Sequence, residues 1–251
     1  MRSESMAWLF ERVDIKCHLL EGGYKSYRNY LLERVGDIPN LIVIEGSTGS
    51  GKTEILQMLR TINEQIIDLE DIANHKGSVF GGIGQEPQPT TQQFQNKIYD
   101  EILGFDLSKR VWIEGESQTV GRVFLPDPLW ACMNSAQNFE IIVPREERIG
   151  RLVREYGSLP SEMMENAISA IVQRLGDQRM REILLLYREN DLTMVADKLL
   201  EYYDQTYRYS REKYKKKITE IILPDADTTS NATILLNRAT ELFPLLPYLN
   251  K

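Results

Sequence analysis

The sequence contains few of the residues that cross-link small domains or bind zinc. Its 251 residues include two cysteines, Cys17 and Cys132, and two histidines, His18 and His75. Two cysteines provide no disulfide framework, and together with two histidines they provide no zinc-ligand cluster. The sequence therefore argues against a disulfide-rich secreted protein and against zinc chemistry, and a reducing, cytoplasmic location is expected.

Long apolar runs and an excess of positive charge are also missing. No run approaches the roughly 18 apolar residues of a membrane span, and the N-terminus lacks a signal-peptide core, so no membrane association is expected. The formal net charge is −7, from 30 basic and 37 acidic residues. This balance argues against a globally basic nucleic-acid binder but allows a local basic face. The length suits one large α/β domain with an appendage.

What the sequence does contain is a phosphate-binding loop of the pattern G-x-x-x-x-G-K-[ST]. An apolar run, 41–44, leads into it and a helical pattern, 54–60, follows. Glycines let successive backbone N–H groups surround an anion, and the helix dipole adds positive charge. We expect Lys52 to contact the outer phosphate and Thr53 to bind a possible Mg²⁺; the alternative is a turn that only caps a helix. The loop consists of Gly46, Ser47, Thr48, Gly49, Ser50, Gly51, Lys52 and Thr53.

Two acidic residues follow another apolar segment. Residues 110–117 are expected to form a strand that ends with Glu114 and Glu116. P-loop proteins orient magnesium or its water with an acid at the end of a buried strand. The sequence does not distinguish between these two glutamates, and solvated acids at a strand end remain the alternative.

Strand and helix patterns alternate through most of the chain. Apolar runs predict strands at 41–44, 65–69, 110–117, 139–144 and 218–223, while 160–217 is expected to be helical. We therefore predict an α/β, P-loop NTPase-like fold: a mostly parallel sheet with helices on both faces and a helical insertion. The glycine-rich segment 70–82 is expected to be a functional loop.

An arginine stripe begins the insertion, which is expected to act as a lid from about 145 to 217. Arginines at a spacing of three lie on one helix face and are suited to closing over phosphates. Interleaved glutamates support a salt-bridged, solvated helix equally well. The stripe consists of Arg145, Arg148, Arg151 and Arg154.

A basic, tyrosine-containing segment ends the insertion. Between residues 208 and 217 there are six basic residues and one acidic residue. This composition suits contacts with an RNA backbone, although a solvated helix end fits it equally well. The candidate tRNA-binding residues are Arg208, Arg211, Lys213, Lys215 and Lys216.

Residues 1–36 form a separate N-terminal segment in this interpretation, and 37–251 form the P-loop domain. Patterns predict a helix at 5–10, a strand at 15–20 and a helix at 24–35. Such a segment buries no core alone, so it either packs on the main domain or completes a partner. Cys17, on the expected strand, fits a packed small residue better than a nucleophile.

Several motifs together resemble those of tRNA 2-selenouridine synthase. The resemblance extends through nearly all of the chain and is more specific than the P-loop. It rests on Asp68-Leu69-Glu70, Ala73-Asn74-His75, Gly77-Ser78, Phe80-Gly81, Glu114-Gly115-Glu116-Ser117, Gly121, Leu125-Pro126, Tyr202-Tyr203-Asp204 and Tyr207.

This resemblance implies a two-step modification of wobble 2-thiouridine in tRNA. The sulfur is geranylated from geranyl diphosphate, and selenium from selenophosphate then replaces the geranylthio group. The donor's diphosphate would bind the P-loop, where Lys52 and the loop N–H groups stabilise it as it leaves and apolar side chains nearby hold the tail. ATP is not excluded as a ligand. Within this hypothesis His75 is an acid–base or RNA-contacting candidate, with a structural histidine as the alternative.

The N-terminal segment resembles the tail of the family's rhodanese domain, without the loop that carries the catalytic cysteine. Cys17 does not replace that cysteine. We therefore expect the C-terminal subunit of a bipartite, archaeal-type enzyme, with a separate rhodanese-like subunit as partner. A shortened single-chain enzyme is the alternative. Two further hypotheses are a nucleotide or small-molecule kinase with an arginine lid and a tRNA-binding adaptor whose P-loop is structural.

Overall fold

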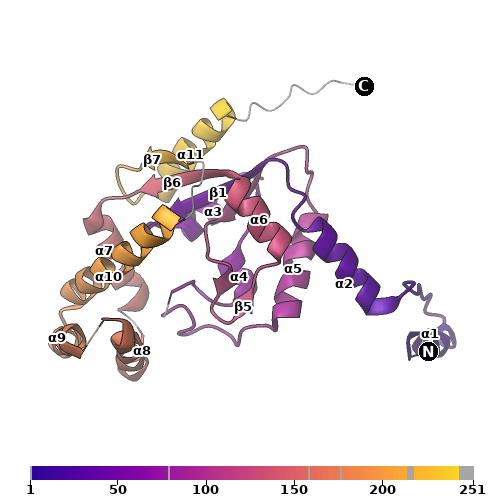
Figure 1. Cartoon of the computed structure of the whole chain (residues 1–251), viewed down its shortest axis with the longest axis horizontal. Coiled ribbons are helices and arrows are strands. Elements are labelled where there is room, and N and C mark those ends of the chain that lie inside the picture. The colour runs from indigo at the N-terminus through magenta and orange to yellow at the C-terminus, as the bar shows by residue number, and fades with distance from the viewer. Residues whose placement is uncertain (1, 79, 158, 176, 214–217, 243–251) are drawn as a thin grey trace.

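The main body is built on a parallel five-stranded sheet (Figure 1). The computed structural model describes residues 2–78, 80–157, 159–175, 177–213 and 218–242. The strand order is β2-β3-β1-β6-β7, and every neighbouring pair is parallel. The sheet confirms the predicted α/β class. The strands are β1 (Leu41–Gly46), β2 (Gln65–Ile67), β3 (Val111–Glu114), β6 (Gln137–Ile142) and β7 (Ile218–Ile222).

Helices cover both faces of this sheet. All six residues of β1 are buried, as expected for a central parallel strand. Ile42 and Ile44 pack with α3 (Lys52–Thr61) and α11 (Thr228–Leu242) on one face. Leu41 and Val43 pack on the other face, which is covered by α2 (Gly23–Arg34), α4 (Leu69–Ala73), α5 (Thr91–Leu103) and α6 (Asp127–Ser135).

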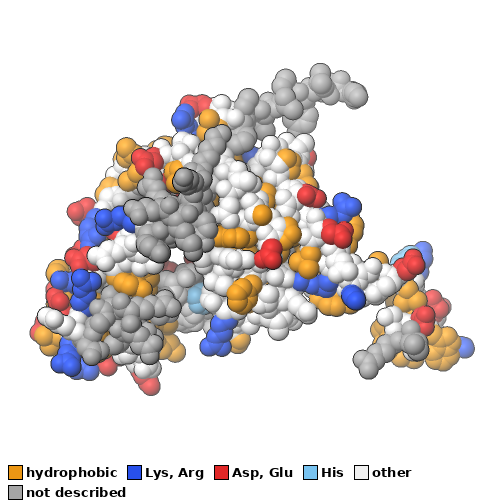
Figure 2. Space-filling model, in the orientation of Figure 1, with side chains coloured by type: hydrophobic (Ala, Val, Ile, Leu, Met, Phe, Trp, Pro, Cys, Tyr) orange, Lys and Arg blue, Asp and Glu red, His pale blue; other side chains and the backbone are white. Residues whose placement is uncertain are grey.

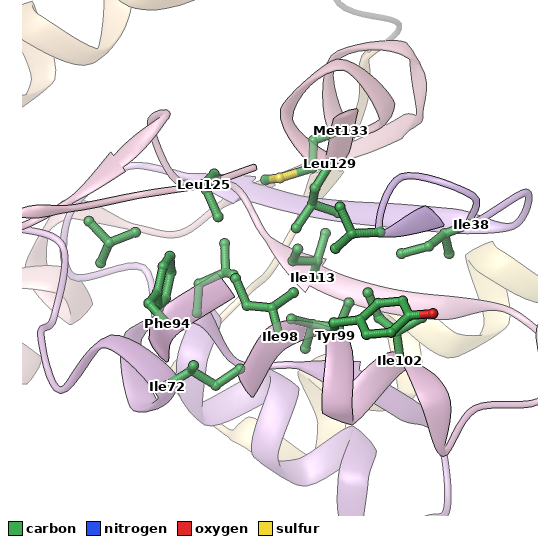
Figure 3. Packing of buried hydrophobic residues seen from close by; sticks show 14 of the residues in the cluster. Ile38, Ile72, Phe94, Ile98, Tyr99, Ile102, Ile113, Leu125, Leu129 and Met133 are labelled. Carbon is green, nitrogen blue, oxygen red and sulfur yellow. The ribbon is translucent and has the colours of Figure 1, made fainter. Parts of the chain in front are cut away.

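The face covered by α5 and α6 contains a dense apolar core (Figure 3). Phe94 and Ile98 from α5 are fully buried beneath Ile113 of β3, and Leu129 of α6 packs into the same cluster. Each such side chain contributes about 1.5–3 kcal/mol through burial. Helix α5 begins at Thr91 because the Thr90 hydroxyl accepts a hydrogen bond from the Gln93 backbone N–H at 3.2 Å.

A helical subdomain follows β6, as predicted for the insertion. It consists of α7 (Arg145–Tyr156), α8 (Ser161–Leu175), α9 (Asp177–Arg188) and α10 (Leu192–Lys213), which gather on one side of the sheet (Figure 1). Ile168, Ile183 and Val195 form its core. Phe80, from the loop after α4, is buried in this core, and its ring centroid lies 5.8 Å from that of Tyr156.

The N-terminal segment differs from the prediction. Residues 15–20 form no strand, because no other strand of the described chain pairs with them. Helix α1 (Arg2–Glu11) instead lies beyond the far end of α2, away from the sheet (Figure 1). Leu31 and Val35 at the other end of α2 are fully buried in the main core.

Several element boundaries also differ from the predicted ones. Strand β2 ends at Ile67, and α4 then begins because the Asp68 carboxylate accepts the Asp71 backbone N–H at 2.9 Å. The expected loop at 70–82 therefore starts with a helical turn. Strand β3 is shorter than the predicted 110–117, and a small hairpin follows it, made of β4 (Thr119–Val120) and β5 (Val123–Phe124). Helix α6 was not predicted. No helix in the described part of the chain has the length and apolarity to span a bilayer.

Candidate functional site: a P-loop cleft

The P-loop connects β1 to the first turn of α3. Gly49 and Gly51 have φ angles of 78° and 83°, a left-handed conformation that glycine adopts without strain. A Cβ on Gly51 would lie 2.6 Å from the guanidinium carbon of Arg151, so a larger residue would collide there. The Lys52 ammonium donates to the Gly46 carbonyl at 2.9 Å, which holds the lysine across the loop. The loop therefore has the backbone form of an anion-binding nest at a helix N-terminus.

Two carboxylates meet at the Thr53 hydroxyl. That hydroxyl donates to Glu70 Oε2 at 3.0 Å and lies 3.4 Å from Glu114 Oε2. The Glu70 backbone N–H donates to Glu114 Oε1 at 2.7 Å, which fixes the two acids relative to each other. Oxygen ligands of this kind suit Mg²⁺, which usually takes one or two carboxylates and completes its shell with water and phosphate. In the described residues no three His, Cys, Asp or Glu side chains form a metal cluster, so Thr53, Glu70 and Glu114 would supply part of the shell only.

The structure separates the two acids that the sequence left equivalent. Glu114 is fully buried at the end of β3 and is tied to α4 and α3 by the hydrogen bonds above. Glu116 lies beyond the strand and lines the cleft described below. A Cβ on Gly77 would lie 2.9 Å from both carboxylate oxygens of Glu116, so the loop after α4 packs directly over this acid.

Burial keeps protons on these acids. Desolvation raises the pKa of Glu114 well above its usual value, and the nearby Glu70 and Asp68 raise it further. Desolvation also raises the pKa of Glu70, against the opposing influence of Lys52. The same balance raises the pKa of Glu116 to about 7. Lys52 alone therefore does not offset the clustered negative charge, and Glu116 can exchange a proton near neutral pH.

A cleft of about 1350 Å³ opens above the P-loop. Its walls come from the loop, from the segments after α4 and β3, and from helices α7 and α10 of the helical subdomain. Aromatic side chains of Trp130, Tyr203 and Tyr207 form part of the lining. The cleft therefore combines a phosphate site with flat apolar surfaces suited to a nucleobase. Its other charged lining residues are Glu45, Glu54, Lys76, Arg151, Arg154 and Glu155.

The arginine stripe lies against the P-loop and against acids of α10. Arg148 donates to the Thr48 carbonyl at 2.9 Å and to Asp204 at 2.6 and 3.1 Å. Arg151 donates to the Gly49 carbonyl at 2.8 Å, and Arg145 pairs with Asp197 at 2.6 Å. The stripe is thus salt-bridged, but Arg148 and Arg151 are buried rather than solvated. Their guanidinium groups bind the loop backbone, and Arg154 is the exposed member that lines the cleft.

His75 lies in a glycine-lined cage. A Cβ on Gly81 would be 2.8 Å from its Cε1, and one on Gly121 would be 2.7 Å from its Cδ2. Its Nδ1 is buried without a hydrogen-bond partner in the described structure, and burial lowers its pKa. His75 does not belong to the cleft lining. This placement fits the structural alternative better than direct contact with a reacting group.

The predicted tRNA-binding residues are only partly visible. Arg208 is exposed on α10, and its Nε lies 3.4 Å from the Asp204 carbonyl. Arg211 and Lys213 belong to α10, but their side chains lie outside the described part, as do Lys215 and Lys216 entirely.

Sequence reasoning missed two acids of the site. Glu70 shares the Thr53 hydroxyl with Glu114, and its position just after β2 was the available signal. Glu45, at the end of β1, is buried against Gly115, where a Cβ would collide with its carboxylate. Its position inside an apolar strand was the signal in that case.

Comparisons with known proteins agree with this site. The sequence model of the family described as "tRNA 2-selenouridine synthase AAA domain" matches residues 39–221. The tRNA 2-selenouridine synthase of Shewanella halifaxensis is 32% identical over 205 residues, which cover 79% of this chain and 53% of that protein. Its counterpart in Sulfurovum sp. is 33% identical over 232 residues, 79% of this chain and 62% of that protein.

Solved structures give a more distant likeness. Shikimate kinase from Bacteroides thetaiotaomicron is 16% identical with a TM-score of 0.39, covering 80% of this chain and 97% of that one. The curated relatives are longer, and this chain spans between about half and two thirds of their length. The family match, however, includes β1, the P-loop and the strands through β7. The chain therefore belongs to the tRNA 2-selenouridine synthase family and contains the P-loop domain of that family.

Proposed function

We propose that this chain is the P-loop subunit of an enzyme that converts wobble 2-thiouridine in tRNA to 2-selenouridine through S-geranyl-2-thiouridine. Geranyl diphosphate and selenophosphate are the donors. The observation that carries the proposal is the P-loop cleft in a chain of this family, where Lys52 and Thr53 face a large space lined by aromatic side chains. The reaction is a group transfer that leaves diphosphate bound at the loop.

In the first step, the sulfur of 2-thiouridine attacks C1 of the geranyl group. The new C–S bond forms as the C–O bond to diphosphate breaks, and diphosphate leaves with the electron pair. Lys52 and the loop N–H groups stabilise that charge, because donors fixed around a leaving anion lower the barrier. The nucleobase loses one proton, and Glu116, with its pKa of about 7, lines the cleft as an acceptor. A bound Mg²⁺, held by Thr53, Glu70 and Glu114, would add positive charge beside the diphosphate.

In the second step, selenium from selenophosphate bonds to C2 of the base, and the C–S bond breaks to release geranylthiol. Water takes up the phosphoryl group as phosphate. We propose that a separate rhodanese-like subunit carries the catalytic cysteine and that the assembly works in the cytoplasm. Exposed apolar side chains support a partner surface on α1: Met6, Trp8 and Leu9 are 48%, 59% and 51% exposed. Figure 2 displays this apolar end projecting from the body.

A nucleotide or small-molecule kinase is the second candidate. The arginines of α7 support it, because Arg151 lies over Gly51 and Arg154 lines the cleft, close to where an outer phosphate would bind. A kinase would need ATP in the cleft instead of a prenyl diphosphate. An adaptor role with a structural P-loop requires no chemistry at Lys52.

Reconstitution distinguishes these candidates. The chain is combined with a candidate rhodanese-like subunit, 2-thiouridine tRNA, geranyl diphosphate, selenophosphate and Mg²⁺, and the wobble nucleoside is analysed by mass spectrometry. We expect S-geranyl-2-thiouridine and then 2-selenouridine, both lost with Lys52→Ala. Failure to modify the tRNA, or ATP turnover that geranyl diphosphate leaves unchanged, would contradict the proposal. Full activity of Lys52→Ala would favour the adaptor.

A further inference from the structure

A second cavity lies beside the P-loop, within the helical subdomain. Phe80, Val153, Met164, Val195 and Leu199 line it, together with other residues of α7 and α10. Phe80, Met164, Val195 and Leu199 are at least nine-tenths buried. The lining is almost wholly apolar, which is unusual for a space adjacent to a phosphate site and gives a polar ligand little to bind.

This cavity is continuous with the large cleft. Five residues line both spaces, and they form the passage between them: Thr48, Ser78, Leu152, Tyr156 and Tyr203. Thr48 is itself a P-loop residue. A ligand whose phosphates lie in the loop therefore has a direct route into an apolar chamber, without crossing the polar part of the cleft.

The chemistry of the lining selects the type of group that enters. A nucleoside or sugar would leave its amide or hydroxyl groups without partners, which costs about 1–3 kcal/mol for each group. A hydrocarbon chain leaves none unpaired and gains about 0.8 kcal/mol for each CH₂ removed from water. Burial raises the pKa of the Tyr156 hydroxyl at the passage, as expected for an apolar environment. The cavity therefore favours a hydrocarbon over a nucleoside.

The size of the cavity limits the length of that hydrocarbon. The space open to the centres of water-sized atoms is about 50 Å³. One water needs about 10–15 Å³ of such space, so the cavity holds roughly three to five water-sized groups. That corresponds to one branched five-carbon unit. A ten-carbon tail would place its outer half in the cavity and its inner half in the passage beside Thr48.

We propose that this cavity is the tail-binding subsite of the P-loop site and that it sets the preferred prenyl chain length at two five-carbon units. The inference rests on the proposed function, since it takes a prenyl diphosphate as donor, and it adds where the tail binds and which residues measure it. Ala196 on α10 lines the cavity and is 6% exposed, so a larger side chain there would occupy the space. Val195, from the same helix, forms another part of the wall.

The test is calorimetric binding of diphosphates to the full chain in the presence of Mg²⁺. Wild-type protein should bind geranyl diphosphate more tightly than dimethylallyl diphosphate or inorganic diphosphate. Ala196→Leu should weaken geranyl diphosphate binding about 10-fold or more, as expected for a filled apolar pocket, and leave inorganic diphosphate unchanged. Val195→Ala enlarges the cavity and should shift the preference several-fold towards farnesyl diphosphate; it also tests the inference if Ala196→Leu does not fold.

Ala167→Leu is the matched control. Ala167 is 8% exposed in the core of the same subdomain and does not line the cavity, so the same substitution there should leave the geranyl preference intact. If folded Ala196→Leu and Val195→Ala keep the wild-type preference among tails, the subsite assignment is wrong while the donor stands. If wild-type protein binds geranyl diphosphate no better than inorganic diphosphate, the donor and the subsite are both wrong.

Discussion

The two walls of the cleft are built in different ways. The sheet wall consists of a glycine loop and acids fixed by backbone hydrogen bonds, such as Glu114 bound to the Glu70 N–H. The subdomain wall is attached to it by side chains, above all by Arg148, which joins the Thr48 carbonyl to Asp204. The sheet wall therefore has fixed geometry for phosphate chemistry, whereas the subdomain wall depends on a few ion pairs and can respond to a ligand.

Removing the attachment should have the largest effect on this difference. Arg148→Ala leaves the largely buried Asp204 without its main partner and the Thr48 carbonyl without a donor. Breaking one side of such a pair costs about 3–5 kcal/mol, and we expect the lower end because Arg145 also approaches Asp204. Urea unfolding measures the loss.

The matched control for that variant is Arg238→Ala. Arg238 pairs with Glu241 at 2.6 Å on the exposed side of α11, where such pairs contribute about 0–1 kcal/mol. Equal losses for the two variants would mean that the Arg148 pair does not hold the walls together.

Removing the charge from the sheet wall should abolish anion binding and leave the fold intact. Lys52→Ala should weaken inorganic diphosphate binding about 100-fold, because hydrogen bonds to charged groups contribute about 1.5–3 kcal/mol each. Thermal unfolding of the free protein should change little. Lys109→Ala, at an exposed lysine paired with Asp106, is the control and should bind normally. Unchanged affinity in Lys52→Ala would remove the lysine from the phosphate site.

The acid of the sheet wall should make stability depend on pH. The folded-state pKa of Glu116 is raised to about 7 from a usual value of 4.5. Below pH 4.5 the carboxyl is protonated whether folded or unfolded; as pH rises towards 7 and above, the folded protein carries a desolvated charge and loses stability. Glu116→Gln should therefore be more stable than wild type by about 1–3 kcal/mol at pH 8 and equal to it at pH 4.

Unfolding measured across this pH range checks that prediction, with Glu86→Gln, at an exposed loop position, as the control. A Glu116→Gln profile parallel to wild type would show that this carboxyl does not titrate near neutrality.

The smallest effect is expected at His75. Because burial lowers its pKa below the usual 6.5, the ring is neutral in both states above that pH, and wild type loses stability as pH falls through and below it. His75→Ala leaves a void in the cage and should cost about 1 kcal/mol at pH 8, with a smaller difference at pH 5. If modification of tRNA falls while stability is unchanged, His75 has a direct role in the reaction after all.

The sequence predicted the features that depend on local patterns. The P-loop, the parallel sheet and the helical insertion follow from glycine spacing and apolar periodicity, which neighbouring residues determine. Features that depend on distant partners were not predictable. The segment at 15–20 has a strand pattern but no strand to pair with, and Glu70 acquires its place only because α4 brings it beside β3.

The arginines show the same limit. Their spacing indicated a helix face, but spacing alone does not reveal that Arg148 meets Asp204, 56 residues later, or the Thr48 carbonyl, 100 residues earlier. The choice between Glu114 and Glu116 likewise required the end of β3 to be located at Glu114.

Phe80 couples the two walls mechanically. It is embedded in the helical subdomain, yet it follows Gly77, whose backbone covers the Glu116 carboxylate. Movement of the subdomain away from the sheet would pull this loop with it and let water reach the acid. The proton affinity of Glu116 would then fall, so an open cleft would release a proton that a closed one retains. Substrate entry and proton transfer at this site would thus be one linked event.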